Sequence, residues 1–150
     1  MDNIAILKYK NINPNNLFIT DFDIKYNLDD FYIQSPIFND YELLNYNSKK
    51  YIELKLDNTK ISHINFLNLI DTIELKLNIY KKNPIKTQII TNIQNKKSLK
   101  VKILDNDTTI FDINKNKMTS LNGNKISLLF KLEFYNIYYS WIAIQILQLK

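Results

Sequence analysis

Cysteine and arginine are absent from this chain of 150 residues, and glycine, histidine and tryptophan each occur once. Without cysteine there are no disulfides, no thiol nucleophiles and no cysteine-based zinc sites. One imidazole, that of His63, leaves very little for multi-histidine metal sites or serine–histidine catalysis. One glycine, Gly123, excludes glycine-rich phosphate loops. We therefore expect no cofactor and no metal.

The absence of arginine limits how the chain could recognise nucleic acid. Every basic side chain is a lysine, so no guanidinium group can read guanine in a bidentate fashion. Lysine acts as a point charge on a phosphate, which favours binding that does not depend on base sequence. The abundance of Asn, Ile, Lys and Tyr matches A/T-rich codons, so the bias is explained better by the genome than by a function.

Long apolar runs are missing as well. No stretch of 18 apolar residues exists, so we expect no membrane span. The N-terminal sequence MDNIAILKYK has no basic head before its apolar residues and does not resemble a secretory signal. The length predicts one β-rich domain over 1–150, large enough to bury a core. These features are compatible with the cytoplasm.

One segment, residues 62–82, is typical of a long helix. Its apolar residues recur at steps of three and four, which places them on one stripe. That stripe comprises Ile64, Leu67, Ile70, Ile73, Leu77 and Tyr80. Ser62 is the expected N-cap, and Asn83-Pro84 should end the helix.

Most of the remaining chain favours strands. They are expected at 4–9, 17–26, 31–34, 51–56, 87–93, 99–104, 108–113, 125–135 and 138–149. Residues 39–50 look polar and irregular, and 95–97 and 105–107 look like hairpin turns. The last strand is apolar on both faces and should be central in its sheet. We expect a mainly β (α+β) fold, either a curved antiparallel sheet or an OB-like β-barrel with one helix. The pattern does not separate a barrel from a sandwich.

Charge is unevenly distributed. Residues 76–102 contain eight lysines and no acid, whereas 21–57 contain eight acids and four lysines. A basic surface for a polyanion explains this segment about as well as a solvated face does. The candidate phosphate-binding residues are Lys81, Lys82, Lys86, Lys96, Lys97, Lys100 and Lys102, with Lys76 at the start of the segment.

Aromatic residues are the second feature expected of a protein that binds single-stranded nucleic acid, because bases stack on exposed rings beside a basic groove. The candidates are Tyr32, Tyr138, Tyr139 and Trp141. Any one of these rings is more often part of a core than a stacking platform. No carboxylate has a convincing base or metal partner in sequence, and Ser35 and Ser140 have no histidine near them in the sequence, so we expect a protein that is not an enzyme.

Several short stretches resemble small proteins of large cytoplasmic DNA viruses, some of them described as single-stranded-DNA-binding-like. The resemblance lies in FYIQSP at 31–36, the strand YIELKL at 51–56, the helix at 65–75 and the ending IQILQL at 144–149. The composition is also similar to proteins of the cytoplasmic linear plasmids of yeasts, which are virus-like elements. Both resemblances imply DNA replication outside the nucleus, in the host cytoplasm or a viral factory.

Two hypotheses follow. The first is a sequence-independent, non-enzymatic single-stranded DNA-binding protein that supports viral or plasmid replication, with DNA favoured over RNA. A homo-oligomer is compatible with this hypothesis, and the sequence leaves the oligomeric state open. The alternative is a structural or assembly protein, such as a minor virion component or an oligomeric β-sandwich subunit, whose lysines would meet an acidic protein partner.

Overall fold

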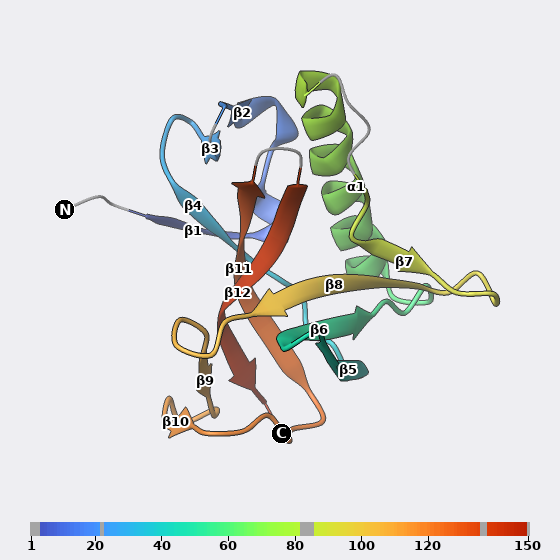
Figure 1. Cartoon of the computed structure of the whole chain (residues 1–150), viewed down its shortest axis with the longest axis vertical. Helices are drawn as coiled ribbons and strands as arrows, with labels where there is room; N and C mark the ends of the chain where they lie inside the picture. The colour runs from blue at the N-terminus through green and yellow to red at the C-terminus, as the bar shows by residue number, and fades with distance from the viewer. Residues whose placement is uncertain (1–3, 22, 82–85, 136–137, 150) are drawn as a thin grey trace.

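A computed structural model describes residues 4–21, 23–81, 86–135 and 138–149, and Figure 1 shows the path of the chain. It contains one α-helix, α1 (Ile61–Lys81), and two short 3₁₀ turns, η1 (Tyr9–Asn11) and η2 (Pro14–Asn16). The strands are β1 (Ala5–Lys8), β2 (Leu17–Ile19), β3 (Ile24–Tyr26), β4 (Phe31–Gln34), β5 (Tyr41–Tyr46), β6 (Lys49–Lys55), β7 (Ile89–Thr91), β8 (Lys97–Ile103), β9 (Thr109–Phe111), β10 (Lys117–Met118), β11 (Ile126–Tyr135) and β12 (Tyr138–Gln148).

The main sheet is open and mixed. It has ten strands, with the order β1-β4-β11-β12-β8-β6-β5, while β7 pairs with β8, β9 pairs with β12 and β10 pairs with β9. The expectation of a β-rich α+β fold with one main helix is confirmed. The prediction of a barrel is wrong, because the order of paired strands ends at β1 and β5 and the sheet does not close on itself within the described residues. The purely antiparallel sheet is also wrong, because β1–β4, β12–β8 and β12–β9 are parallel.

The central position expected for the last strand is confirmed, because β12 pairs with β11, β8 and β9. Strands β8 and β9 lie one after the other along the same edge of β12, so the turn at 105–107 is not a hairpin. Thr108 holds this loop in place. Its hydroxyl accepts a hydrogen bond from the Leu104 amide at 2.9 Å and donates one to the Ala143 carbonyl at 2.6 Å.

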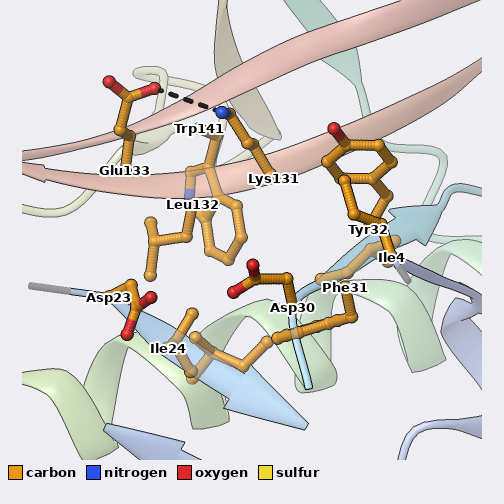
Figure 2. Close-up of a pocket in the computed structure, with 12 residues that line it drawn as sticks. Ile4, Asp23, Ile24, Asp30, Phe31, Tyr32, Lys131, Leu132, Glu133 and Trp141 are labelled. Carbon is orange, nitrogen blue, oxygen red and sulfur yellow. Dashed lines mark ion pairs between the residues drawn. The ribbon is translucent and has the colours of Figure 1, made fainter. Parts of the chain in front are cut away.

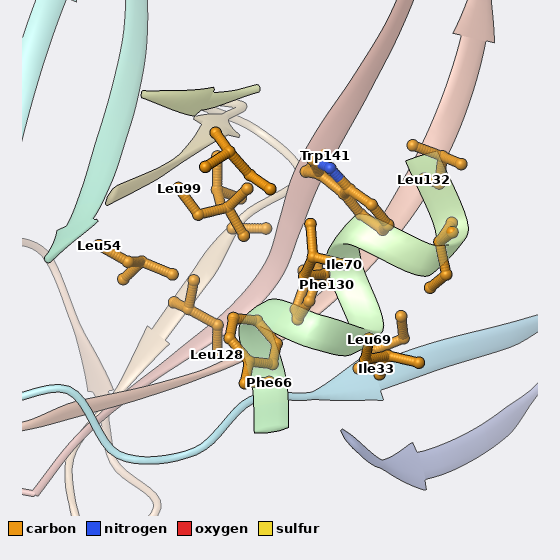
Figure 3. Packing of buried hydrophobic residues seen from close by; sticks show 14 of the residues in the cluster. Ile33, Leu54, Phe66, Leu69, Ile70, Leu99, Leu128, Phe130, Leu132 and Trp141 are labelled. Carbon is orange, nitrogen blue, oxygen red and sulfur yellow. The ribbon is translucent and has the colours of Figure 1, made fainter. Parts of the chain in front are cut away.

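The helix α1 packs on one face of the sheet (Figure 1). The rings of Phe66 and Phe130 form an edge-to-face contact (Figure 3). Phe130 forms a second contact of this kind with Trp141, and the centroids of these two rings are 5.4 Å apart. Edge-to-face arrangements of this kind stabilise aromatic pairs beyond the area that they bury. The core of the molecule therefore lies between α1 and the inner face of β4, β11, β12, β8 and β6.

Two details of the helix differ from the sequence prediction. Ser62 is not the N-cap, because the helix begins at Ile61, and the Lys60 carbonyl accepts hydrogen bonds from the amides of both His63 and Ile64 at 3.1 Å. The buried face is also rotated. Ile64 and Tyr80 are exposed, and the buried set is His63, Phe66, Leu69, Ile70, Ile73, Glu74 and Leu77. The expected end at Lys82 lies outside the described residues.

Two strand predictions also change. The segment 39–50 forms most of a hairpin, in which β5 and β6 are joined by Asn47 and Ser48 with φ of 51° and 65°. Two residues with positive φ are typical of the tight type I′ hairpin turn. The run 17–26 is split into β2 and β3, which form a separate two-stranded sheet.

Of the helices in the described ranges, none has the length and continuous apolar character of a transmembrane span.

Candidate nucleic-acid interface

The face of the main sheet opposite α1 is not covered by the helix, and its composition follows from the strand register. Side chains alternate along a strand, and residues paired across strands point to the same face. Because Ile33, Phe130, Trp141, Leu99 and Ile52 belong to the core side, their strand neighbours form the other side, called the outer face here. It comprises Ile6, Lys8, Tyr32, Gln34, Glu42, Leu44, Tyr46, Lys49, Tyr51, Glu53, Lys55, Ser98, Lys100, Lys102, Leu129, Lys131, Glu133, Tyr138, Ser140 and Ile142.

The outer face is basic and rich in tyrosine. Six of its side chains are lysines and three are glutamates, and four are tyrosines from strands far apart in the sequence. Tyr46 is 71% exposed, and Tyr32 and Tyr51 are half-buried. Partly exposed rings that stand among lysines are the arrangement that single-strand binders use.

Tyr51 and Lys100 form the centre of this face. The Lys100 ammonium lies 4.5 Å from the centroid of the Tyr51 ring, which is within the range of a cation–π contact. Burial, and then the positive charge of nearby Lys86, lowers the pKa of Lys100. Lys102 pairs with Tyr51 in the register of β6 and β8 and points to the same side. Positive charge is therefore concentrated around one aromatic ring.

The lysines of the outer face differ in how they are engaged. Lys55 forms ion pairs with Glu53 at 3.4 Å and Glu42 at 3.5 Å, and Lys131 pairs with Glu133 at 3.7 Å. Within the described residues no carboxylate lies at ion-pair distance from Lys8, Lys49, Lys100 or Lys102. These four ammonium groups can meet an anion without first breaking a salt bridge.

The structure separates the lysines that the sequence grouped together. Lys86, Lys100 and Lys102 lie at or near the outer face, as the pairing of β8 and the effect of Lys86 on Lys100 indicate. Lys81 ends α1, at the opposite end of the helix from the β7–β8 turn that carries Lys96 and Lys97 (Figure 1). Lys82 lies outside the described residues. The charge-rich segment is therefore divided among different surfaces.

The lysines at the β7–β8 turn line a groove of about 770 Å³ between that turn and the start of α1. Its charged lining residues are Lys55, Lys96, Lys97, Asp40, Glu53 and Asp57, so positive and negative side chains balance. Ile64, Leu67 and Ile90 give it an apolar floor. A groove in which positive and negative charges balance attracts a polyanion less strongly than the basic outer face does.

The predicted aromatic residues are divided between surface and core. Trp141 is 1% exposed and Tyr139 is 3% exposed, so neither ring presents a face to a ligand, and we remove both from the candidate interface. The Trp141 indole N–H donates a hydrogen bond to the buried Glu74 carboxylate at 3.4 Å. Burial, together with Glu74, raises the pKa of Tyr139. Tyr32 and the exposed Tyr138 remain candidates.

Sequence reasoning missed Tyr46, Tyr51, Lys8, Lys49 and Lys131. The alternation of 51–56 predicts a strand, but it does not show which residues of other strands lie beside its polar side. Tyr46 and Lys49 lay in the segment interpreted as irregular. Only the pairing of β5, β6 and β8 brings these residues beside Lys100 and Lys102.

A smaller cavity of about 260 Å³ opens where β4 and β11 diverge (Figure 2). Among the described residues the two strands pair at Leu129–Gln34 and Phe130–Ile33 and not beyond, so this part of the structure shows an open edge on β11 past that point. Asp23, Asp30 and Glu133 stand around the cavity, and each is already engaged by a lysine (Lys25 or Lys131). These carboxylates disfavour phosphate, so the cavity marks a boundary of the basic surface.

Comparison with known proteins adds no family assignment: no family model, curated protein or solved structure matches this chain. Within the described ranges, no three or more His, Asp or Glu side chains gather where they could hold a metal ion.

Proposed function

We propose that this protein binds single-stranded nucleic acid without sequence preference through its outer face. The observation that carries the proposal is the group of Tyr51, Tyr46 and three lysines on three adjacent strands. These lysines, Lys49, Lys100 and Lys102, have no ion-pair partner among the described residues. Lysines on phosphates would supply affinity at every sequence, and tyrosine rings would stack on bases of any kind.

The contact between Lys100 and Tyr51 suggests how a ligand would bind. A base could displace the ammonium group from the ring, and that group could then bind the adjacent phosphate. Stacking on an aromatic side chain contributes about 1–3 kcal/mol per base. Because the Lys100 ammonium is partly desolvated in the free protein, contact with a phosphate would restore a favourable partner to it.

A preference for DNA and a role in viral or plasmid replication in the cytoplasm rest on the sequence resemblance alone. The geometry of the outer face is compatible with DNA or RNA, because both offer bases and phosphates. In this proposal the protein has no catalytic residues and needs no cofactor.

The test is a titration of fluorescein-labelled oligo-dT followed by anisotropy, with duplex DNA of equal charge as the control. A label is needed because the buried Trp141 would not report stacking at the surface. We expect tighter binding of the single strand and steep weakening with salt. Equal affinity for duplex, or no binding at low salt, would contradict the proposal and favour an assembly protein.

A further inference from the structure

The strand β5 ends the main sheet, and its outer edge has no partner strand in the part of the chain that the structure describes. Edge strands are normally protected by lysine, proline or a bulge, because their free backbone groups can pair with another chain. Between Tyr41 and Tyr46 there is no lysine or proline, and the register with β6 is unbroken. The edge strand at the other end, β1, is shorter and carries Lys8.

The hydrogen bonds to β6 show which groups of β5 face outward. The Lys55 amide donates to the Asp40 carbonyl at 3.1 Å, so these two residues form a hydrogen-bonded pair. Such pairs alternate along an antiparallel ladder with pairs that are not hydrogen-bonded. It follows that Tyr41, Leu43 and Asn45 direct their N–H and C=O groups away from β6, towards the open edge.

We propose that two copies of this chain pair through β5, antiparallel, with Leu43 opposite the partner's Leu43. In this register Tyr41 lies opposite the partner's Asn45, and Asn45 opposite the partner's Tyr41. Every outward-facing residue of the strand then finds a hydrogen-bonding partner. A shift by two residues in either direction leaves one of them unpaired on each chain.

Side chains also suit this register. Glu42, the one charged residue of β5, lies opposite the partner's Leu44 rather than opposite a second Glu42. Leu43 is 50% exposed, and the pairing covers it with its own copy at the symmetry axis. Because each copy uses its β5 edge once, the two-fold arrangement closes as a dimer and does not propagate into fibres.

The dimer extends the outer face. Paired residues point to the same face of a continuous sheet, so Leu44 and Tyr46 of both copies stand on one side. Two basic, tyrosine-bearing surfaces would then adjoin. Pairing through β5 does not depend on nucleic-acid binding, and only this extension rests on the proposed function.

The first test is molar mass by light scattering over a wide range of concentrations, with the full chain. We expect about twice the 17.9 kDa of one chain. Leu43→Lys places two ammonium groups at the axis and should return the mass to that of one chain. Ile79→Lys likewise replaces an aliphatic side chain with lysine, but at an exposed position on α1, and should leave the dimer intact.

The second test fixes the register and uses the natural absence of cysteine. Opposite residues of a hydrogen-bonded pair have Cα atoms about 5.5 Å apart, within the range of a disulfide. Leu43→Cys should therefore form a linked dimer on mild oxidation. Leu44→Cys should not, because diagonal neighbours on paired strands lie about 7–8 Å apart.

Several results would overturn the inference. If the molar mass is that of one chain at every concentration, two copies do not pair through β5. The open edge would then fit a strand of a different protein. A dimer that survives Leu43→Lys, or one that links more readily through Leu44→Cys, would place the contact elsewhere. Because the cysteine variants alter the side chain only modestly, the second test stands even if Leu43→Lys fails to fold.

Discussion

The Lys100 ammonium lies 4.5 Å from the centre of the Tyr51 ring, although the two residues are far apart in the sequence. Strand pairing brings them together, because Tyr51 of β6 lies opposite Lys102 of β8 and Lys100 lies two residues away on the same face. A cation and a ring held together on the sheet face opposite α1 are the two elements that a single-strand binder needs. This contact is the centre of the proposed interface.

The first prediction concerns the ring of Tyr51. Replacing Tyr51 by Ala should weaken binding of oligo-dT by about 1–3 kcal/mol, or roughly 5- to 150-fold, because a stacking surface is lost. Tyr51→Phe keeps the ring and should bind nearly as well as the original protein. Fluorescence anisotropy at one fixed salt concentration gives both affinities. Unchanged affinity in Tyr51→Ala would remove this ring from the interface.

The second prediction concerns the β5–β6 turn. Ser48 has φ of 65°, a left-handed conformation that is costly for a residue with a Cβ. Ser48→Gly should raise the free energy of unfolding by about 1 kcal/mol. Ser62→Gly is the matched control, because Ser62 has helical backbone in α1, where glycine should lower stability. Urea denaturation measures both, and a shift of the same sign in the two variants would contradict the assigned turn.

The third prediction concerns Tyr139 at alkaline pH. Burial and Glu74 raise its pKa, so the folded protein keeps the hydroxyl protonated above pH 10, where an unfolded tyrosine loses its proton. The contribution of Tyr139 to stability is therefore fully present below about pH 10 and declines above it, by up to about 1.4 kcal/mol per pH unit.

The Tyr139→Phe variant isolates this effect because it removes the titrating group and keeps the ring. The difference in free energy of unfolding between the original protein and the variant should be constant near neutral pH and move in favour of the variant above about pH 10. Chemical denaturation over this range provides the measurement. A difference that stays constant at alkaline pH would show that Tyr139 is not buried.

The fourth prediction concerns His63, which joins two loops to the start of α1. Its Nδ1 accepts a hydrogen bond from the Asp57 amide at 2.9 Å, and its Nε2 lies 2.8 Å from the Ile37 carbonyl, so the proton is on Nε2. His63→Ala should lower the free energy of unfolding by at least about 2 kcal/mol, since it removes both contacts and leaves a cavity. Ile64→Ala, at the next and exposed position, should cost less in the same urea experiment. Equal losses would argue against this role.

Strong local patterns in the sequence were sufficient to predict several elements of the fold. The continuous apolar character of β12 indicated a central strand, and the strand predicted at 31–34 has the bounds of β4. The single helix was found, but its buried face was rotated. Apolar residues lie nearly all around α1, so spacing alone could not show that Phe66 would be buried and Tyr80 exposed.

Other features depend on contacts that no local pattern contains. The edge strand β5 carries polar residues and looked irregular, because pairing with β6 rather than a buried face defines it. The placement of β8 and β9 along one edge of β12, and the open ends of the sheet, are set by the packing of distant segments. The choice between barrel and open sheet was beyond the sequence for the same reason.

Residues of the candidate site were found only in part. Lys100, Lys102 and Tyr32 were named, but a charge-rich run does not show which face each side chain occupies. Trp141 looked like a stacking residue because composition cannot distinguish a buried ring from an exposed one. Register, rather than the density of charge along the chain, brings Tyr51 into the site.

The most direct test of the proposed interface compares two double variants with the same loss of charge. Lys49→Gln with Lys102→Gln removes two lysines of the outer face, and Lys96→Gln with Lys97→Gln removes two from the balanced groove. Each lysine–phosphate contact on a single strand contributes about 0.7 to the slope of log K against log salt. The account predicts that the first variant lowers this slope by about 1.4 and that the second leaves it nearly unchanged. The reverse result, or an equal loss in both, would place nucleic-acid binding away from the outer face.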